Sequence, residues 1–276
     1  MRKNDFTLLI IFLCTQTCFS QKQKDEPTTY LDDLFIGWIK DADTLRLKAV
    51  SKSFAPIEIY FTSEKNNTEL SSFLLNPKDS LELTKYCGKL PDSIFKSRFE
   101  DSVRIGYYFG HKSIIKPNLD YSYRLPFKTN KKYEVSQSFN GKFSHNSSRS
   151  RFAIDFQLNV GESVYAARPG IVVKVIDWFT KQGGKELINA ANKIIILHSD
   201  GTFASYVHLD YKGSLVQEGE FVEKGEKIGF SGLTGYTRGP HLHFVVRKER
   251  DVSIPIYFKG FEGKTLKKGK RYKVVE

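Results

Sequence analysis

The sequence predicts a mainly β protein with two domains. Aromatic residues make up 14% of the 276 residues, and many fall in short runs that alternate apolar and polar positions, as half-buried strands do. Turn-forming residues separate the runs in the first half, and regularly spaced glycines separate them in the second half. A hydrophobic content of 40% is enough for one large core or two ordinary ones.

The first twenty residues have the pattern of a secretory signal peptide. A basic start at residues 2–3 precedes an apolar stretch from Phe6 to Cys14, and the small residues Cys18 and Ser20 precede a cleavage point. The apolar stretch is shorter than the roughly 20 residues that a membrane span needs. A lipoprotein anchor is the alternative, although the residues before the two cysteines fit it poorly. We therefore expect residues 1–20 to be a signal peptide and the protein to be periplasmic or secreted, with no stable membrane insertion.

Charge and cysteine content narrow the possible partners. The net charge of +12 favours anionic polymers such as cell walls. Nucleic acid is not expected as a partner because the sequence has no basic helix or aromatic-basic motif. Cys87 is the one cysteine beyond the signal peptide, so we expect no intrachain disulfide and a small buried side chain at this position. Nothing in the sequence fixes the oligomeric state.

Residues 21–130 are predicted to form an N-terminal β-rich accessory domain. Residues 57–61 and 103–109 are two of its short β-type runs, and Asn and Pro residues supply turns between such runs. A small antiparallel β-sandwich fits this pattern. No cluster of reactive side chains appears here. A polar, Pro-containing bridge at 126–132 ends the region.

Residues 131–276 form the second predicted domain, which contains five of the six histidines together with regularly spaced glycines. A polar insertion at 180–192 is expected to carry a short helix. The predicted strands cover residues 151–158, 163–167, 170–178, 193–198, 203–209, 227–230 and 241–247.

The pair His241 and His243 is the strongest chemical signal. The two residues open an apolar, β-branched segment that is predicted to be a strand, where residues i and i+2 point to the same face. Two imidazoles side by side can hold a metal with one ring and transfer protons with the other.

Asp155 is the second signal, because it interrupts an otherwise apolar strand face. A carboxylate in such a place must be paired, hydrogen-bonded or bound to a metal. The ordinary alternative is a salt bridge to one of the arginines at 149, 151 and 168.

His145 and His208 complete a set of candidates around this carboxylate. His145 lies in a predicted loop and His208 near a strand end, whereas His111 and His198 lie in a predicted bend and a hairpin turn and are expected to be exposed. Two histidines and one carboxylate make a catalytic zinc shell with a fourth position for water. The remaining imidazoles could move a proton and stabilise an oxyanion. Spacing alone does not say which three residues are the ligands.

Residues from about 133 to 258 resemble the lysostaphin-type, or LytM-type, zinc metallopeptidases. The resemblance runs through four blocks in order: Phe-Ser-His145 with Ala-Ile-Asp155-Phe; Val-Tyr-Ala-Ala-Arg-Pro-Gly-Ile-Val; Tyr206-Val-His208-Leu; and Gly-Leu-Thr-Gly-Tyr-Thr-Arg-Gly-Pro-His241-Leu-His243-Phe. It implies an antiparallel β-sheet groove walled by loops, with the peptide part of peptidoglycan as substrate.

The resemblance also implies a role for each matching residue. His145, Asp155 and His243 match the ligands of one Zn²⁺ per chain. His208 and His241 match the catalytic histidines, one acting as general base and the other orienting or stabilising the oxyanion, and Tyr206 matches a tyrosine at the edge of the site that contacts substrate. Many members of the family separate the first histidine and the aspartate by three residues, whereas nine intervene between His145 and Asp155 here.

The resulting prediction is an exported zinc metalloendopeptidase that hydrolyses peptide bonds of cell-wall peptidoglycan. A second possibility is a catalytically inactive LytM-type regulator that activates a partner cell-wall amidase. A third is an exported binding module whose histidines are structural. The enzyme is favoured because all five positions of the site are filled.

Overall fold

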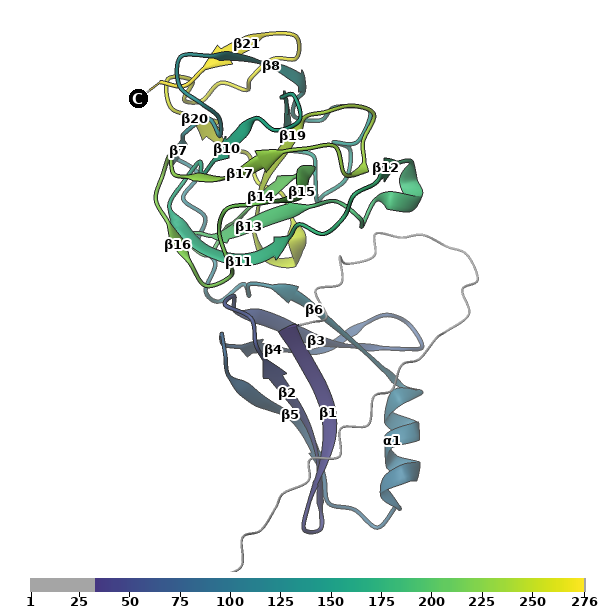
Figure 1. Ribbon diagram of the computed structural model, residues 1–276. Coiled ribbons are helices and arrows are strands. Elements are labelled where there is room, and N and C mark those ends of the chain that lie inside the picture. Colours follow the sequence, from purple (N-terminus) through teal and green to yellow (C-terminus); the bar gives the residue numbers. More distant parts are fainter. Residues whose placement is uncertain (1–32, 276) are drawn as a thin grey trace, which may run out of the picture.

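The computed structural model describes residues 33–275, so the predicted signal peptide lies outside the described residues. Two β-rich units are stacked one on the other (Figure 1). We call residues 33–115 the N-terminal unit and residues 121–275 the C-terminal unit. Within residues 33–275, no helix is both long enough and apolar enough to cross a membrane.

The N-terminal unit is a sandwich of two three-stranded antiparallel sheets, β1-β2-β5 and β4-β3-β6. Its strands are β1 (Leu34–Asp41), β2 (Thr44–Ser51), β3 (Ile57–Ser63), β4 (Glu69–Leu75), β5 (Ser80–Tyr86) and β6 (Val103–Phe109). Alternating residues of these strands, among them Leu47, Ile59 and Leu83, are buried together in one core. The predicted β-sandwich is therefore confirmed.

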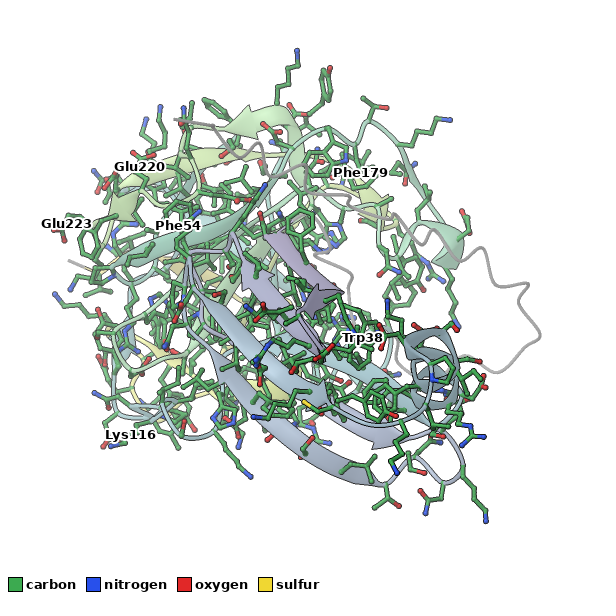
Figure 2. The ribbon with its side chains drawn as sticks, turned by 90° about the horizontal axis from the view of Figure 1, so that it is seen from below. Trp38, Phe54, Lys116, Phe179, Glu220 and Glu223 are labelled. Carbon is green, nitrogen blue, oxygen red and sulfur yellow. The ribbon has the colours of Figure 1, made fainter. Side chains whose placement is uncertain are left out.

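One helix of this unit was not predicted from the sequence. Helix α1 (Asp92–Glu100) follows Pro91 and places Phe95 and Phe99, four positions apart, on one face. Both rings lie edge-on against Trp38 of β1, which Figure 2 labels. Tertiary packing of these aromatic rings therefore supports a helix whose local sequence is only weakly amphipathic.

The C-terminal unit is built on an eight-stranded antiparallel sheet in the order β16-β11-β13-β14-β19-β9-β8-β21. A three-stranded sheet, β10-β17-β15, and the parallel pair β7–β20 lie over one of its faces, and the main core fills the space between. The large sheet contains β8 (Lys132–Gln137), β9 (Ile154–Gln157), β11 (Gly170–Ile176), β13 (Lys193–Leu197), β14 (Phe203–Val207), β16 (Phe221–Val222), β19 (Leu242–Arg247) and β21 (Arg271–Lys273). The covering strands are β7 (Ser122–Tyr123), β10 (Ser163–Tyr165), β15 (Leu209–Ser214), β17 (Lys227–Ser231) and β20 (Tyr257–Phe258).

Each strand predicted for this unit is present, with ends that shift by a few residues. The insertion at 180–192 carries β12 (Gln182–Gly183), which pairs with β18 (Gly235–Tyr236), and the short helix η2 (Lys185–Leu187). Residues 122–127 differ from expectation, because Tyr123, Leu125 and Phe127 are buried in the C-terminal core rather than in the N-terminal domain.

Two side chains have the opposite exposure to the one predicted. His198 is only 2% exposed: its hairpin turn folds against Tyr123, and its Nδ1 lies 2.9 Å from the carbonyl oxygen of Pro169. Cys87 is exposed at the end of β5 and contacts the hydroxyl of Thr44. Residue type alone was a poor guide at both positions, because exposure depends on which segment packs over the turn.

The N-terminal unit packs against one face of the large sheet. Ala55 and Ile115 form a cluster with Ile195 and Phe203, and the ring of Phe109 stacks on that of Phe203 at 5.9 Å. Phe54, labelled in Figure 2, lies so close to Gly219 that a Cβ there would come within 2.4 Å of its ring. Gly219 also has φ +92°, so both space and backbone require glycine at this contact.

Charged groups also cross the junction between the units. Glu58 of β3, which is 0% exposed, accepts two hydrogen bonds from Arg250 of the turn η3 (Glu249–Asp251). Lys174 of β11 pairs with Asp33 at 2.7 Å. The N-terminal unit is thereby fixed to the sheet by both apolar and ionic contacts.

Candidate active site

Asp155 of β9 and His243 of β19 are direct cross-strand partners on one face of the large sheet. The Nδ1 atom of His243 lies 2.8 Å from Oδ1 of Asp155. Leu242 and Phe244, on either side of His243, are buried in the core on the opposite face. The strand alternation predicted from the sequence therefore sets the histidine beside the carboxylate.

His145 reaches the same point from the loop between β8 and β9. Its Nε2 lies 3.2 Å from Oδ1 of Asp155 and 3.3 Å from Nδ1 of His243, and the residue is completely buried. One ligand atom from each of the three residues lies within 4.8 Å of the other two. Nine intervening residues thus still allow the loop to bring His145 to the carboxylate.

The hydrogen bonds around these three side chains fit a metal ligand set. The Nδ1–H of His145 donates to the carbonyl oxygen of Ser138 at 2.9 Å, which leaves the lone pair of Nε2 directed at the cluster. The amide of Gln137 donates to Oδ2 of Asp155 at 3.1 Å and leaves Oδ1 facing the two histidines. Two imidazole nitrogens and one carboxylate oxygen in this arrangement match the donor set of a catalytic zinc site.

His208 and His241 form a second pair of imidazoles next to the ligand group. Their ring centroids are 4.6 Å apart, and Nε2 of His241 is 3.8 Å from Oδ1 of Asp155. The Nδ1–H of His208 donates to the carbonyl oxygen of Thr234 at 2.7 Å, and that of His241 donates to the carbonyl oxygen of Gly239 at 2.9 Å. In both rings Nε2 is therefore the acceptor nitrogen.

The backbone at His208 is strained in a way that serves the site. Its φ of 65° lies in the left-handed region, which residues other than glycine seldom adopt. This conformation ends β14 and breaks the strand alternation, so that Val207 and His208 both line the cleft although they are adjacent in the chain. A regular strand would direct the imidazole to the other face.

Burial and neighbouring charges shift the protonation of the cluster. Burial alone would raise the pKa of Asp155, but its close contacts with His145 and His243 outweigh burial and hold the pKa well below its ordinary range. Burial lowers the pKa of His243. Burial, reinforced by the nearby His241 and His243, lowers the pKa of His208 to about 3. The carboxylate is thus ionised beside His208 and His243, whose pKa values are both lowered.

Asp155, His208, His241 and His243 line one cleft of about 880 Å³, and the buried His145 contacts two of them, Asp155 and His243. The floor of the cleft is formed by side chains of β9, β13, β14 and β19 on the face that carries His243. The loop before β9, the η2 insertion and the loop before β19 contribute lining residues around this floor. A cleft of this volume accommodates several residues of a peptide.

Two predictions from the sequence fail at this point. Tyr206 is not at the edge of the cleft: it is 0% exposed in the core, and its hydroxyl accepts a hydrogen bond from the amide of Ala167 at 2.7 Å. It lies between two cleft residues of β14, so its side chain points to the opposite face. The alternative of a salt bridge to Asp155 is also wrong for two of the three arginines, because Arg149 pairs with Asp251 and Arg168 with Asp200.

Several groups that position the site were missed in the sequence. The carbonyl oxygens of Ser138, Thr234 and Gly239 fix three imidazoles, and the side chain of Gln137 holds the carboxylate. Backbone carbonyls carry no residue-type signal, so only the fold could identify them. Gln137 lies eight residues before His145, and its role depends on the pairing of β8 with β9.

Residues 149–255 match the model of "Peptidase family M23". The matched segment includes Asp155, His208, His241 and His243, whereas His145 lies four residues before it.

Three relatives are similar to part of the chain. An "Uncharacterized metalloprotease" of Buchnera aphidicola subsp. Baizongia pistaciae is 34% identical over 48% of this chain and 33% of its own length. Lysostaphin of Staphylococcus staphylolyticus is 36% identical over 34% of this chain and 18% of its own length. Peptidoglycan DD-endopeptidase ShyA of Vibrio cholerae is 30% identical over 43% of this chain and 26% of its own length. The matches thus span a third or less of each relative.

The similarity to a relative that is named a metalloprotease is consistent with a possible metal site at His145, Asp155 and His243. These matches confirm the resemblance to lysostaphin-type peptidases, and residues 149–255 are the part of the chain that is similar to peptidase family M23.

Proposed function

We propose that the chain is an exported zinc metalloendopeptidase that hydrolyses peptide bonds of bacterial peptidoglycan. The observation that carries the proposal is the convergence of Asp155, His243, His208 and His241 in one cleft, with the buried His145 against Asp155 and His243 and with three of the imidazoles oriented by carbonyl oxygens. Relatives with peptidoglycan DD-endopeptidase activity in their names support the choice of substrate. The net charge of +12 favours approach to an anionic wall.

His145, Asp155 and His243 would hold one Zn²⁺ through Nε2, Oδ1 and Nδ1. Bound there, zinc would polarise the peptide carbonyl and lower the pKa of a coordinated water to about 7. Gln137 keeps the carboxylate turned toward the two ligand imidazoles.

His241 and His208 would handle the proton. Each ring presents an acceptor Nε2, and the His241 side chain is 18% exposed, so it is open to an attacking water. Once His241 has accepted the proton at Nε2, it becomes a donor that can pass the proton to the leaving amine. His208, 4.6 Å away between ring centroids, would orient the water and the developing oxyanion.

The test is muropeptide release from isolated peptidoglycan by the purified mature protein, analysed by mass to name the bond, together with the metal content of each variant. His243→Ala should lose zinc and activity together, because it removes a ligand. His241→Ala should keep zinc and lose activity by about 10²–10⁴-fold, the usual contribution of a positioned general base. His111→Ala, outside the cleft, is the control and should change neither.

Release that His243→Ala leaves intact would exclude the zinc mechanism. Equal zinc loss in His243→Ala and His241→Ala would show that the two histidines do not have separate roles. A wild-type protein that neither holds zinc nor releases muropeptides would instead point to the inactive regulator, which the complete five-residue set does not favour.

A further inference from the structure

The turn that carries His208 is held by two segments that are distant from it in sequence. The φ of 65° at His208 is strained, and a strained backbone persists only where the surrounding contacts fix it. The carbonyl oxygen of His208 accepts a hydrogen bond from the amide of Gly232 at 2.8 Å, and the amide of Leu209 donates to the carbonyl oxygen of Asn192 at 3.1 Å. The backbone is thus bonded on both sides of the strained position.

Thr234 contacts this turn through both its backbone and its side chain. Its carbonyl oxygen accepts from the Nδ1–H of His208 at 2.7 Å. Its hydroxyl donates to the carbonyl oxygen of Leu209 at 2.9 Å and accepts from the amide of Asn192 at 3.0 Å. Thr234 is only 3% exposed, so bulk water does not supply these bonds when the hydroxyl is removed. One residue therefore fixes both the direction of the His208 ring and the backbone that follows it.

Asn192 is the second fixed point beside His208. It is 0% exposed, and its side-chain amide donates to the carbonyl oxygens of Phe179 at 2.8 Å and Asp210 at 3.0 Å. Its side-chain oxygen accepts from the amide of Phe179, which Figure 2 labels, at 2.8 Å. Two carbonyl acceptors and one amide donor are compatible with a single orientation of this side chain. Asn192 thereby ties the chain just after His208 to the base of the insertion at 180–192, which lines the cleft.

The segment that carries Thr234 lies directly against the backbone of the turn. A Cβ at Gly232 would come within 2.4 Å of the Cα of Asp210 and 2.6 Å of the carbonyl carbon of Leu209. These are backbone atoms, which cannot move aside as the end of a flexible side chain can. The hydroxyl of Thr234 is thus held in a tightly packed place next to the turn.

We propose that Asn192 and Thr234 are positioning residues for His208, which together hold its left-handed backbone and direct its Nε2 into the cleft. The assignment rests on the proposed function, in which His208 orients the water and the developing oxyanion. Neither Asn192 nor Thr234 is among the residues that line the cleft. Their removal therefore impairs the reaction step rather than the binding of substrate or zinc.

The test compares two substitutions of one residue. Thr234→Val keeps the size of the side chain but removes the hydroxyl that bonds two buried backbone groups, whereas Thr234→Ser keeps the hydroxyl. With a soluble cross-linked muropeptide as substrate, Thr234→Val should lower kcat by about 10–100-fold, as expected for a small misplacement of a catalytic group. The KM and the zinc content should stay near those of the wild-type protein. Thr234→Ser should retain most of the wild-type kcat.

The tautomer of the His208 ring gives a readout that does not depend on activity. Long-range ¹H–¹⁵N NMR spectra of the metal-free protein report which ring nitrogen carries the proton. The wild-type protein and Thr234→Ser should show the Nδ1–H tautomer alone, because the carbonyl oxygen of Thr234 accepts that proton. Thr234→Val should show an added population with the proton on Nε2.

Thr202→Val is the matched control. Thr202 is also 0% exposed, and its hydroxyl donates to Asp200 at 2.7 Å, but it does not line the cleft. This variant should lower the urea midpoint and leave both kcat and the His208 tautomer unchanged. Asn192→Asp sets a carboxylate against two carbonyl oxygens and should change kcat and tautomer in the same direction as Thr234→Val. If Asn192→Asp does not fold, the two Thr234 variants decide.

An unchanged kcat or an unchanged tautomer in Thr234→Val would overturn the proposal. An equal loss of kcat in Thr202→Val would overturn it as well, because the loss would then be a general effect of removing a buried hydroxyl. If the wild-type protein releases no muropeptide, the proposed function fails, and the tautomer comparison still decides whether Thr234 holds His208. Release by the wild-type protein and by Thr234→Val at equal kcat refutes the positioning role alone.

Discussion

The ion pair between Glu58 and Arg250 allows a quantitative test of how the N-terminal unit is attached. Arg250 Nη2 lies 2.6 Å from one carboxylate oxygen of Glu58, and Nε lies 3.3 Å from the other. Glu58 is 0% exposed, whereas the Arg250 side chain is 39% exposed and also contacts Glu69 at 2.7 Å. Without Arg250, the Glu58 carboxylate is buried away from water, whereas without Glu58 the Arg250 guanidinium still contacts Glu69 and solvent.

Arg250→Ala leaves a buried carboxylate without this partner, and we expect it to lower the free energy of unfolding by about 3–5 kcal/mol. Glu58→Ala leaves an arginine that still contacts Glu69 and water, so we expect a loss of only about 1–2 kcal/mol. The double variant should be more stable than Arg250→Ala alone, because it no longer buries the unpaired charge.

Urea unfolding measures these differences, and tryptophan fluorescence can follow it because Trp38 and Trp178 lie one in each unit. Equal losses for the two single variants would refute the reasoning. A double variant less stable than Arg250→Ala would refute it as well, because the Glu58 carboxylate would then not be the source of the cost.

Two further predictions test the buried polar groups that the sequence placed wrongly. Burial lowers the pKa of His198 from 6.5 to about 4. As the pH falls, the unfolded chain therefore binds a proton at His198 before the folded protein does, which favours unfolding. The free energy of unfolding should be unaffected by this group above pH 6.5 and should fall by about 3 kcal/mol as the pH drops to about 4. His198→Gln should lack this part of the acid sensitivity when urea midpoints are measured across that pH window. The same dependence of the midpoint on pH in the wild-type protein and the variant would contradict the burial of a neutral His198. Tyr206→Phe should cost about 1–3 kcal/mol, since it leaves the buried amide of Ala167 without its acceptor, while muropeptide release per folded molecule stays unchanged. A loss of muropeptide release without a loss of stability in this variant would support the contact between Tyr206 and substrate that the sequence predicted.

Strand positions and the face of each strand were predictable because they depend on local alternation. The pattern around His243 and Asp155 correctly indicated side chains on one sheet face, and the strands of the C-terminal unit follow the predicted runs. Helix α1 was not predicted, because its support comes from Trp38, which is more than fifty residues away in sequence.

Exposure was less predictable, since it depends on which distant segment covers a residue. His198 is buried by Tyr123, and Tyr206 faces the core although its neighbours Ser205 and Val207 line the cleft. Strand alternation by itself indicates the core for Tyr206, because Ser205 and Val207 on either side of it face the cleft.

The sequence alone determined the five candidate residues and the β character of the chain, because residue type and strand period are local properties. The tertiary structure decided which atoms meet: the loop carries His145 to Asp155, the left-handed backbone turns His208 into the cleft, and carbonyl oxygens fix which ring nitrogen faces it. It also decided that Asn192 and Thr234 meet beside His208 and that the N-terminal unit packs on the sheet face that carries the cleft. These are contacts between segments far apart in the chain, and no local pattern encodes them.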